Sequence, residues 1–113
     1  MTATHVPYTW IADDLEAAAA LLETEGWIRH HYRNEYGRCA VGALIKATGQ
    51  EGRHCLDWDL TPIYVAAAAM GFETDRGTDD LVHWNDDQDS AEPVIELMKN
   101  TAKDLRNRAL PIE

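Results

Sequence analysis

Several features that mark common classes of protein are missing from this sequence. It has two cysteines, Cys39 and Cys55, and no export signal, which argues against a disulfide framework and predicts reduced thiols. No basic stretch followed by an apolar one opens the chain, and its apolar runs are far shorter than the roughly 20 residues that span a bilayer. We therefore expect a soluble protein in the cytoplasm.

Metal-ligand patterns are also missing. The residues that could bind zinc include no Cys-x-x-Cys or His-x-x-x-His pair: Cys39, Cys55, His54, His30 and His31. The closely spaced Asp86, Asp87 and Asp89 suggest a calcium loop, but the glycine and closing glutamate of an EF-hand are absent. We expect no metal and no other cofactor.

Length and composition are those of an ordinary globular domain. The chain has 113 residues, of which 45% are hydrophobic and 27% charged. A chain of this size buries roughly two-thirds of its unfolded surface, so it needs no covalent staples. Residues 1–113 are predicted to form a single domain.

The net charge of −10 is distributed unevenly. Residues 57–113 hold thirteen acids and five Lys or Arg, whereas residues 1–56 hold seven acids and five. We call the acid-rich segment at residues 73–92 the acidic face; its acids are Glu73, Asp75, Asp79, Asp80, Asp86, Asp87, Asp89 and Glu92. Such a surface repels nucleic acid and anionic membranes and favours a partner with a basic surface.

Glycines and capping residues predict two helices in the first half of the chain. Thr9 is expected to cap a helix that ends at Gly26. The next helix begins near Cys39 and ends at Gly49, and its apolar composition predicts a buried central helix. Between these helices, the aromatic residues 27–38 are expected to form an irregular arm or a short β-hairpin.

Two more helices are expected in the second half. Thr61 caps the first of them, with Pro62 at its first position and Gly71 at its end. Its four alanines, 66–69, predict the close approach of another backbone. Asp89 or Ser90 caps the last helix, which places Val94, Leu97, Met98 and Leu105 on one face. The predicted fold is all-α, a compact bundle of about four helices.

Three short motifs stand out along the chain. They are Gly26-Trp27, the segment Gly-Arg-Cys-Ala-Val-Gly-Ala-Leu at 37–44, and Trp84-Asn85-Asp86. In this order and spacing the chain resembles an uncharacterised family of small proteins from actinobacteria and their phages, a domain of unknown function. The resemblance spans roughly residues 9–105. The chain departs from it in the long loop at 50–61 and in the acidic run from Asp86 to Asp89. The resemblance implies a fold and a biological context, but no mechanism.

Cys39 is the candidate for enzymatic chemistry. A helix N-terminus and the adjacent Arg38 would favour its thiolate, and His83 or His54 could act as a base oriented by Asn85 or Asp86. The alternative is a small buried residue, with Gly42 and Ala43 allowing close helix packing. The sequence favours this structural role because no cysteine-hydrolase signature surrounds Cys39.

The Trp84-Asn85-Asp86 motif also has two interpretations. The indole could stack on a ligand while the amide and carboxylate supply hydrogen bonds. The favoured alternative is an anchored turn before the last helix, with Trp84 in the core and the polar pair bonded to nearby backbone.

The arm at 27–38 is basic and aromatic. Arg29, Arg33 and Arg38 alternate with aromatic side chains, a pattern that can stack bases or bind phosphate. Alternatively, the arginines neutralise acids of the same or a neighbouring subunit. A basic arm and an acidic face on one chain also predict self-association through opposed patches.

The sequence as a whole predicts a small non-enzymatic protein-binding module. The expected contact surface consists of seven carboxylates and one indole: Glu73, Asp75, Asp79, Asp80, Trp84, Asp86, Asp87 and Asp89. The partner would be a host protein or a second copy of the chain. A cysteine-dependent enzyme using Cys39 and a nucleic-acid or nucleotide binder using the arm are the alternatives.

Overall fold

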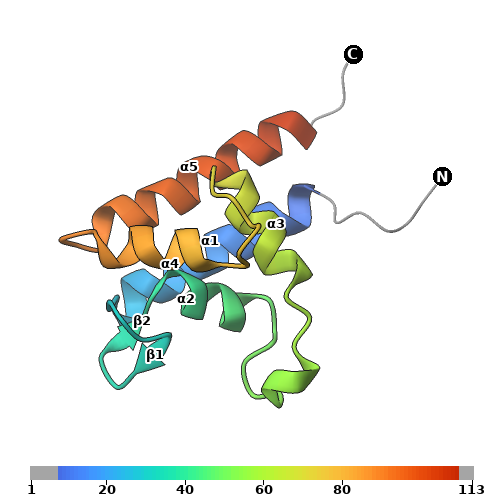
Figure 1. The fold of residues 1–113 in the computed structure, drawn as a ribbon. Coiled ribbons are helices and arrows are strands. Elements are labelled where there is room, and N and C mark those ends of the chain that lie inside the picture. Colours follow the sequence, from blue (N-terminus) through green and yellow to red (C-terminus); the bar gives the residue numbers. More distant parts are fainter. Residues whose placement is uncertain (1–7, 110–113) are drawn as a thin grey trace.

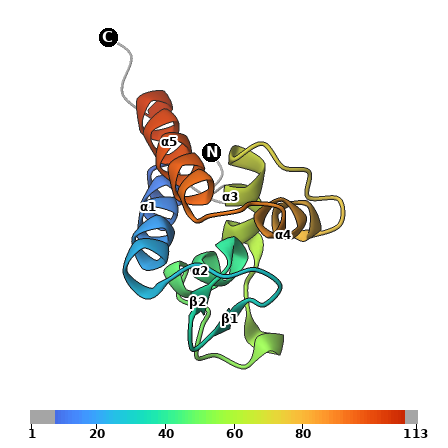
Figure 2. The same ribbon diagram turned by 90° about the vertical axis from the view of Figure 1, so that its left-hand side faces the viewer.

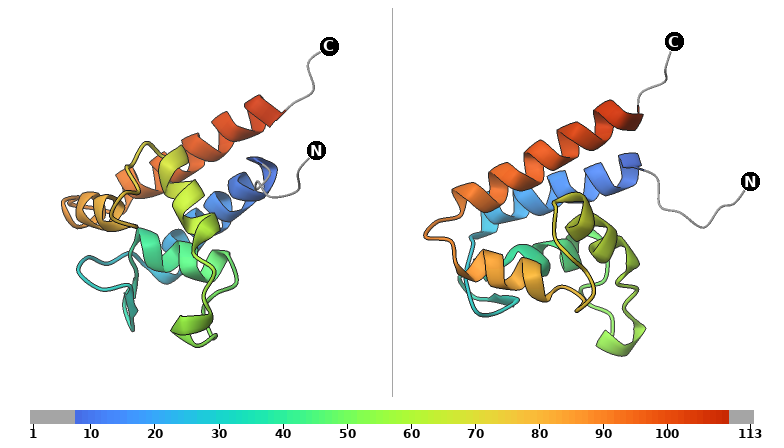
Figure 3. Two further views of the ribbon diagram at one scale, coloured as in Figure 1. Left: turned by 45° about the vertical axis from the view of Figure 1, so that its right-hand side comes forward. Right: turned by 45° about the horizontal axis from the view of Figure 1, so that its top comes forward.

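A computed structural model describes residues 8–109 as five α-helices, one short 3-10 helix and a two-stranded hairpin. Figure 1 shows their arrangement. The two long helices, α1 (Tyr8–Glu25) and α5 (Glu92–Ala109), lie side by side and run in opposite directions, and they form the most extensive contact between elements. Figure 3 shows the same pairing from two further directions. The prediction of a mostly helical fold with a short hairpin is confirmed.

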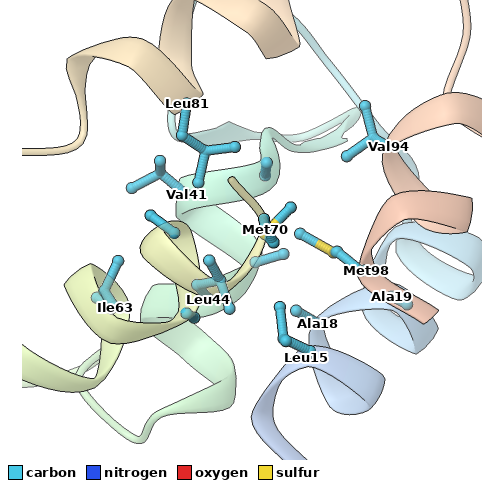
Figure 4. Close-up of a cluster of buried hydrophobic side chains, with 14 of the residues drawn as sticks. Leu15, Ala18, Ala19, Val41, Leu44, Ile63, Met70, Leu81, Val94 and Met98 are labelled. Carbon is cyan, nitrogen blue, oxygen red and sulfur yellow. The ribbon is translucent and has the colours of Figure 1, made fainter. Parts of the chain in front are cut away.

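The central helix is α2 (Ala40–Ala47), and all its residues from Ala40 to Ile45 are buried. It packs against α1 and α4, as its nearly continuous apolar sequence predicted. Figure 4 shows Val41 and Leu44 of this helix among core side chains from the surrounding helices, including Leu15, Leu81 and Met98. Each of these five side chains is at most 3% exposed.

The arm at 27–38 contains the predicted hairpin. Strands β1 (Arg33–Asn34) and β2 (Gly37–Arg38) pair antiparallel, with Arg33 opposite Arg38. A single bridge also links Trp27 to Arg38, so the hairpin is joined to the residue that follows Gly26.

The helix count was one too low. Residues Asp79–Asp86 form α4, so Trp84-Asn85-Asp86 lies in the last turn of a helix and not in a separate turn before α5. Asp79 and Asp80 in the first turn favour this helix, because acids stabilise the positive end of the helix dipole. Its two buried residues, Leu81 and Asn85, are four apart and face inward together.

Three helices begin at residues that differ from those expected from the predicted caps. Thr9 lies inside α1, which already includes Tyr8. Leu60 occupies the N-cap of α3 (Thr61–Ala69), so Thr61 and Pro62 are its first two residues. Helix α5 begins at Glu92, two residues after Ser90. The three glycine stops are correct, because Gly26, Gly49 and Gly71 all have positive φ.

The alanine run of α3 is buried over its first half only. Ala66 and Ala67 are buried against the core, whereas Ala68 and Ala69 are exposed.

A short 3-10 helix, η1 (Cys55–Asp57), lies in the loop between α2 and α3. None of the helices within residues 8–109 has the length and apolarity needed to cross a membrane.

Candidate functional site

The side chain of Asn85 joins the three sequence motifs. It is fully buried, and its Oδ1 accepts hydrogen bonds from Trp27 Nε1 at 2.7 Å and from the Ala40 N–H at 3.0 Å. Its Nδ2 donates to the Ile28 carbonyl at 3.2 Å and to Asp86 Oδ1 at 3.1 Å. An amide side chain has two acceptor sites and two donors, so all four are used inside the protein. Asn85 therefore holds the fold together and has no hydrogen-bonding group left for a ligand.

Glycines of the motifs permit close backbone contact. A Cβ on Gly42 would lie 1.9 Å from the Tyr32 carbonyl oxygen, and one on Gly37 would lie 2.3 Å from Gly26. The same Tyr32 carbonyl, which lies next to Gly42, accepts the Cys39 N–H at 3.1 Å. Close packing of the arm on α2 explains the lack of a side chain at Gly42, and the close approach of Gly26 explains it at Gly37.

Cys39 occupies the N-cap position of α2. Its Sγ accepts a hydrogen bond from the Gly42 N–H at 3.4 Å, and the residue is 2% exposed. Burial raises the pKa of the Cys39 thiol, which is the opposite of the shift that activates a nucleophilic cysteine. This geometry agrees with the structural role that the sequence favoured.

The histidines near Cys39 are not the ones proposed from the sequence. His54 lies in the loop after α2 and His83 is exposed on α4. A pocket of about 350 Å³ is instead lined by Cys39 together with His30, His31 and Asp86. Sequence spacing gave no sign of this grouping, because Asp86 is more than fifty residues from His30.

Asp86 faces the arm. Its Oδ1 accepts the His30 N–H at 2.9 Å, and its Oδ2 lies 3.5 Å from His30 Nδ1. Partial burial opposes ionisation of Asp86, but the hydrogen bonds from His30 and Asn85 outweigh it and lower its pKa. His30 has a φ of +75°, and this bond helps to hold its backbone there. Asp86 is therefore less available to a partner than the sequence suggested.

The remaining acids of the acidic face lie in the loop before α4, on α4, in the connection that follows it and at the first residue of α5. Figure 2 shows α4 and the loop before it on the side of the molecule away from α1. Within residues 8–109, seven of these acids form no ion pair with the chain itself: Glu73, Asp75, Asp79, Asp80, Asp87, Asp89 and Glu92. All are exposed except Asp80, which is half-buried. Trp84 is half-buried too, with its ring centroid 5.4 Å from that of Phe72.

By contrast, several acids on α1 form ion pairs with basic residues of α5. Arg106 of α5 bonds Asp13 at 2.7 Å and Glu16 at 2.6 Å, both on α1. Lys99 of α5 bonds Glu23 of α1 at 2.8 Å. These pairs connect the two helices and reduce the charge on that side of the molecule.

The three arginines of the arm also have partners within the chain. Arg38 is 9% exposed and pairs with Glu51, at 2.9 Å, and with Glu25. Arg33 lies 3.4 Å from Glu51, and Arg29 donates to the Gln88 carbonyl at 3.2 Å. For Arg33 and Arg38 the geometry agrees with neutralisation of acids of the same subunit, whereas Arg29 bonds a backbone carbonyl. Nucleic-acid binding by the arm stays a prediction.

Among the side chains that the structure describes, which exclude that of Cys55, no three His, Cys, Asp or Glu residues gather in a group that could hold a metal ion.

A family model matches most of the chain. Residues 7–104 match a protein family described as "Family of unknown function (DUF6197)", and this range contains all three motifs. No curated protein and no solved structure matches the chain.

Proposed function

The chain belongs to a family of unknown function, DUF6197, and we propose that it is a non-enzymatic module that binds a basic protein through its acidic face. The observation that supports this proposal is the contrast between two sets of acids. Those on α1 that face α5 are paired with Arg106 or Lys99, whereas seven of those in residues 73–92 have no ion pair among the described residues. Unpaired acids repel one another and favour a partner that supplies positive charge.

The position of Asp87 supports the same proposal. It is the C-cap residue of α4, where the negative end of the helix dipole disfavours an acid. Its side chain is exposed and has no ion-pair partner in residues 8–109. An acid that costs stability is better explained by an interaction outside the chain than by the fold.

A cysteine-dependent enzyme has less support. The Cys39 thiol is buried with a raised pKa, and Asn85, the proposed orienting residue, uses all of its hydrogen-bonding groups within the fold. We therefore infer a binding role and not a catalytic one.

The biological setting is part of the proposal. We infer an accessory protein of an actinobacterium or its phage, acting in the cytoplasm of the bacterial cell. Its partner would be a host protein with a basic surface. Because closely spaced carboxylates resemble a row of phosphates in charge, a nucleic-acid-binding surface is the kind of surface that fits.

Charge reversal tests this function. In a pull-down from actinobacterial lysate, a triple variant with Asp79, Asp80 and Asp87 each changed to Lys should lose the partners that the wild-type chain retains. Asp86 is left unchanged because it holds His30. The matched control reverses Glu35, Asp57 and Glu96, which are exposed, lie outside the acidic face and form no ion pair among the described residues. The two variants have the same net charge, so retention of the same partners by both would reject the acidic face as the contact surface.

A further inference from the structure

A second candidate site is a cavity of about 580 Å³ that is lined by the arm, by α2 and by the loop after α2. Volumes of about 300–1,000 Å³ are typical of small-molecule sites. The residues that decide its chemistry are two arginines, a histidine, two aromatic residues and one aliphatic residue: Arg33, Arg53, His54, Tyr32, Trp58 and Ile45.

The loop wall of this cavity is held in place by hydrogen bonds. Gln50 is 6% exposed; its Oε1 accepts the Asp59 N–H at 2.9 Å and its Nε2 donates to the Thr48 carbonyl at 3.2 Å. One buried side chain therefore ties together both ends of the loop. Inside the loop, Trp58 Nε1 donates to the Arg53 carbonyl at 3.1 Å.

The arm wall is held as well. The Tyr32 carbonyl accepts the Cys39 N–H, and its oxygen lies where a Cβ on Gly42 would be. Since both walls are fixed by contacts within the chain, the cavity exists before any ligand binds, and binding costs little ordering of the protein.

The charge around the cavity is positive. Glu51 also lines it, but this carboxylate is bonded to both Nη2 and Nε of Arg38, at 2.9 and 3.3 Å. Arg53 is exposed and forms no ion pair within the described residues, and Arg33 is paired only at 3.4 Å. Residues 27–58 contain five Lys or Arg and three acids, whereas the rest of the chain contains five and seventeen. Residues 27–58 therefore carry an excess of basic residues in a chain that is strongly acidic as a whole.

The aromatic residues complete the chemistry. Tyr32 is 52% exposed although it has a large apolar ring, and the half-buried Trp58 lines the same cavity. We propose that this cavity binds a small organic anion with a flat aromatic ring. The ring packs on Tyr32 and Trp58, and Arg33 and Arg53 bind the carboxylate or phosphate. The site is separate from the acidic face and does not depend on the proposed docking function.

Titration of the ¹⁵N-labelled protein with four probes tests the ligand class. Salicylate and AMP combine a flat ring with an anion, inorganic phosphate lacks the ring, and proflavine is a flat cation. We expect salicylate or AMP to shift the amide signals of Gly42 and Gly52 and the Trp58 indole signal, with a Kd below about 1 mM. For phosphate and proflavine, the Kd obtained from the same signals should be at least tenfold higher. Binding of salicylate alone identifies a carboxylate site, and binding of AMP alone a phosphate site.

A pair of variants locates the binding. Arg53→Gln should weaken the binding of the better anion at least fivefold, because Arg53 has no other ion-pair role in the described chain. Arg76→Gln makes the same change of net charge at an exposed arginine that does not line the cavity, and it should leave the Kd unchanged. The proposal is overturned if neither salicylate nor AMP shifts these signals at millimolar concentration. It is equally overturned if proflavine binds there as tightly, or if the two variants have the same affinity.

Discussion

Asn85 and Trp27 are 58 positions apart in the sequence, and the indole Nε1 donates to the amide Oδ1 at 2.7 Å. The same oxygen accepts the N–H of Ala40, the first residue of α2. One side chain thus joins the end of α4, the start of the arm and the start of the central helix. Each of these segments carries one of the three sequence motifs.

Replacing Asn85 by Ala should destabilise the protein by about 2–5 kcal/mol, because it leaves several buried hydrogen-bonding groups without a partner. Urea unfolding followed by circular dichroism measures the change. Asn100→Ala, at an exposed position of α5, serves as the control and should change the free energy of unfolding by less than about 0.5 kcal/mol. Equal effects of the two variants would contradict a structural role for Asn85.

Glu51→Gln should lower stability at pH 7 by about 1 kcal/mol, since it weakens the bond to the mostly buried Arg38. The hydrogen bond from Arg38 lowers the pKa of Glu51 below its ordinary value of 4.5. A lowered pKa means that the unfolded chain binds the proton first, so this contribution is present above pH 4.5 and is lost as the pH falls below it. The difference between wild type and variant in urea midpoint should therefore shrink from pH 7 to pH 3. A difference that stays constant with pH would exclude this ion pair as its source.

Asp87→Lys should separate stability from function. A cation at the C-terminus of α4 should raise the free energy of unfolding by about 0.3–1 kcal/mol. It should also weaken binding of the basic partner in the pull-down, because the acidic face loses one carboxylate and gains a positive charge. The two measurements are made on the same preparation. A variant that is less stable, or that binds the partner more tightly, would contradict the role assigned to Asp87.

Cys39 should resist alkylation in the folded protein. Burial raises the pKa of its thiol, so at pH 8 iodoacetamide should modify Cys39 at least tenfold more slowly than in the urea-unfolded chain. Mass spectrometry of peptides after digestion separates Cys39 from Cys55. Fast modification of folded Cys39 below pH 7 would instead support the cysteine-dependent enzyme.

Self-association is tested by size-exclusion chromatography at low and high salt. Arg33 and Arg38 are already paired with Glu51 in the same chain, which leaves Arg29 as the arm arginine bound only to a backbone carbonyl. If opposed patches join two copies, the low-salt dimer should dissociate at 0.5 M NaCl, where charges are screened over a few ångströms. A salt-insensitive monomer at high protein concentration rules this association out.

The sequence predicted the elements whose signals are local. Gly26, Gly49 and Gly71 end helices by adopting positive φ. The apolar run of α2 predicts that this helix is buried, whichever elements it packs against. It did not predict α4, because one of the two buried positions of that helix is Asn85, which is polar. The hydrophobic periodicity that reveals a helix is therefore missing.

The contacts of the candidate sites could not be predicted from the sequence, for a different reason. Three of the four Asn85 bonds and the approach of His30 to Asp86 connect residues 45–58 positions apart, and such pairing depends on the tertiary fold. The two walls of the larger cavity likewise come from separate segments. Only the residue types, arginines alternating with aromatics in the arm, indicated in advance that this region differs from the rest of the chain.

The pairing of α1 with α5 has a consequence for how the protein is made. Helix α1 emerges from the ribosome first, but the helix that makes the largest contact with its apolar side is the last of the described elements. At about 5–20 residues per second, some 80 residues of further synthesis leave α1 without this partner for roughly 4–16 s. Its alanine-rich apolar face is then open to chaperones and to neighbouring nascent chains. Native packing of α1 therefore waits until α5 has been made, and truncation before α5 should yield a chain that aggregates.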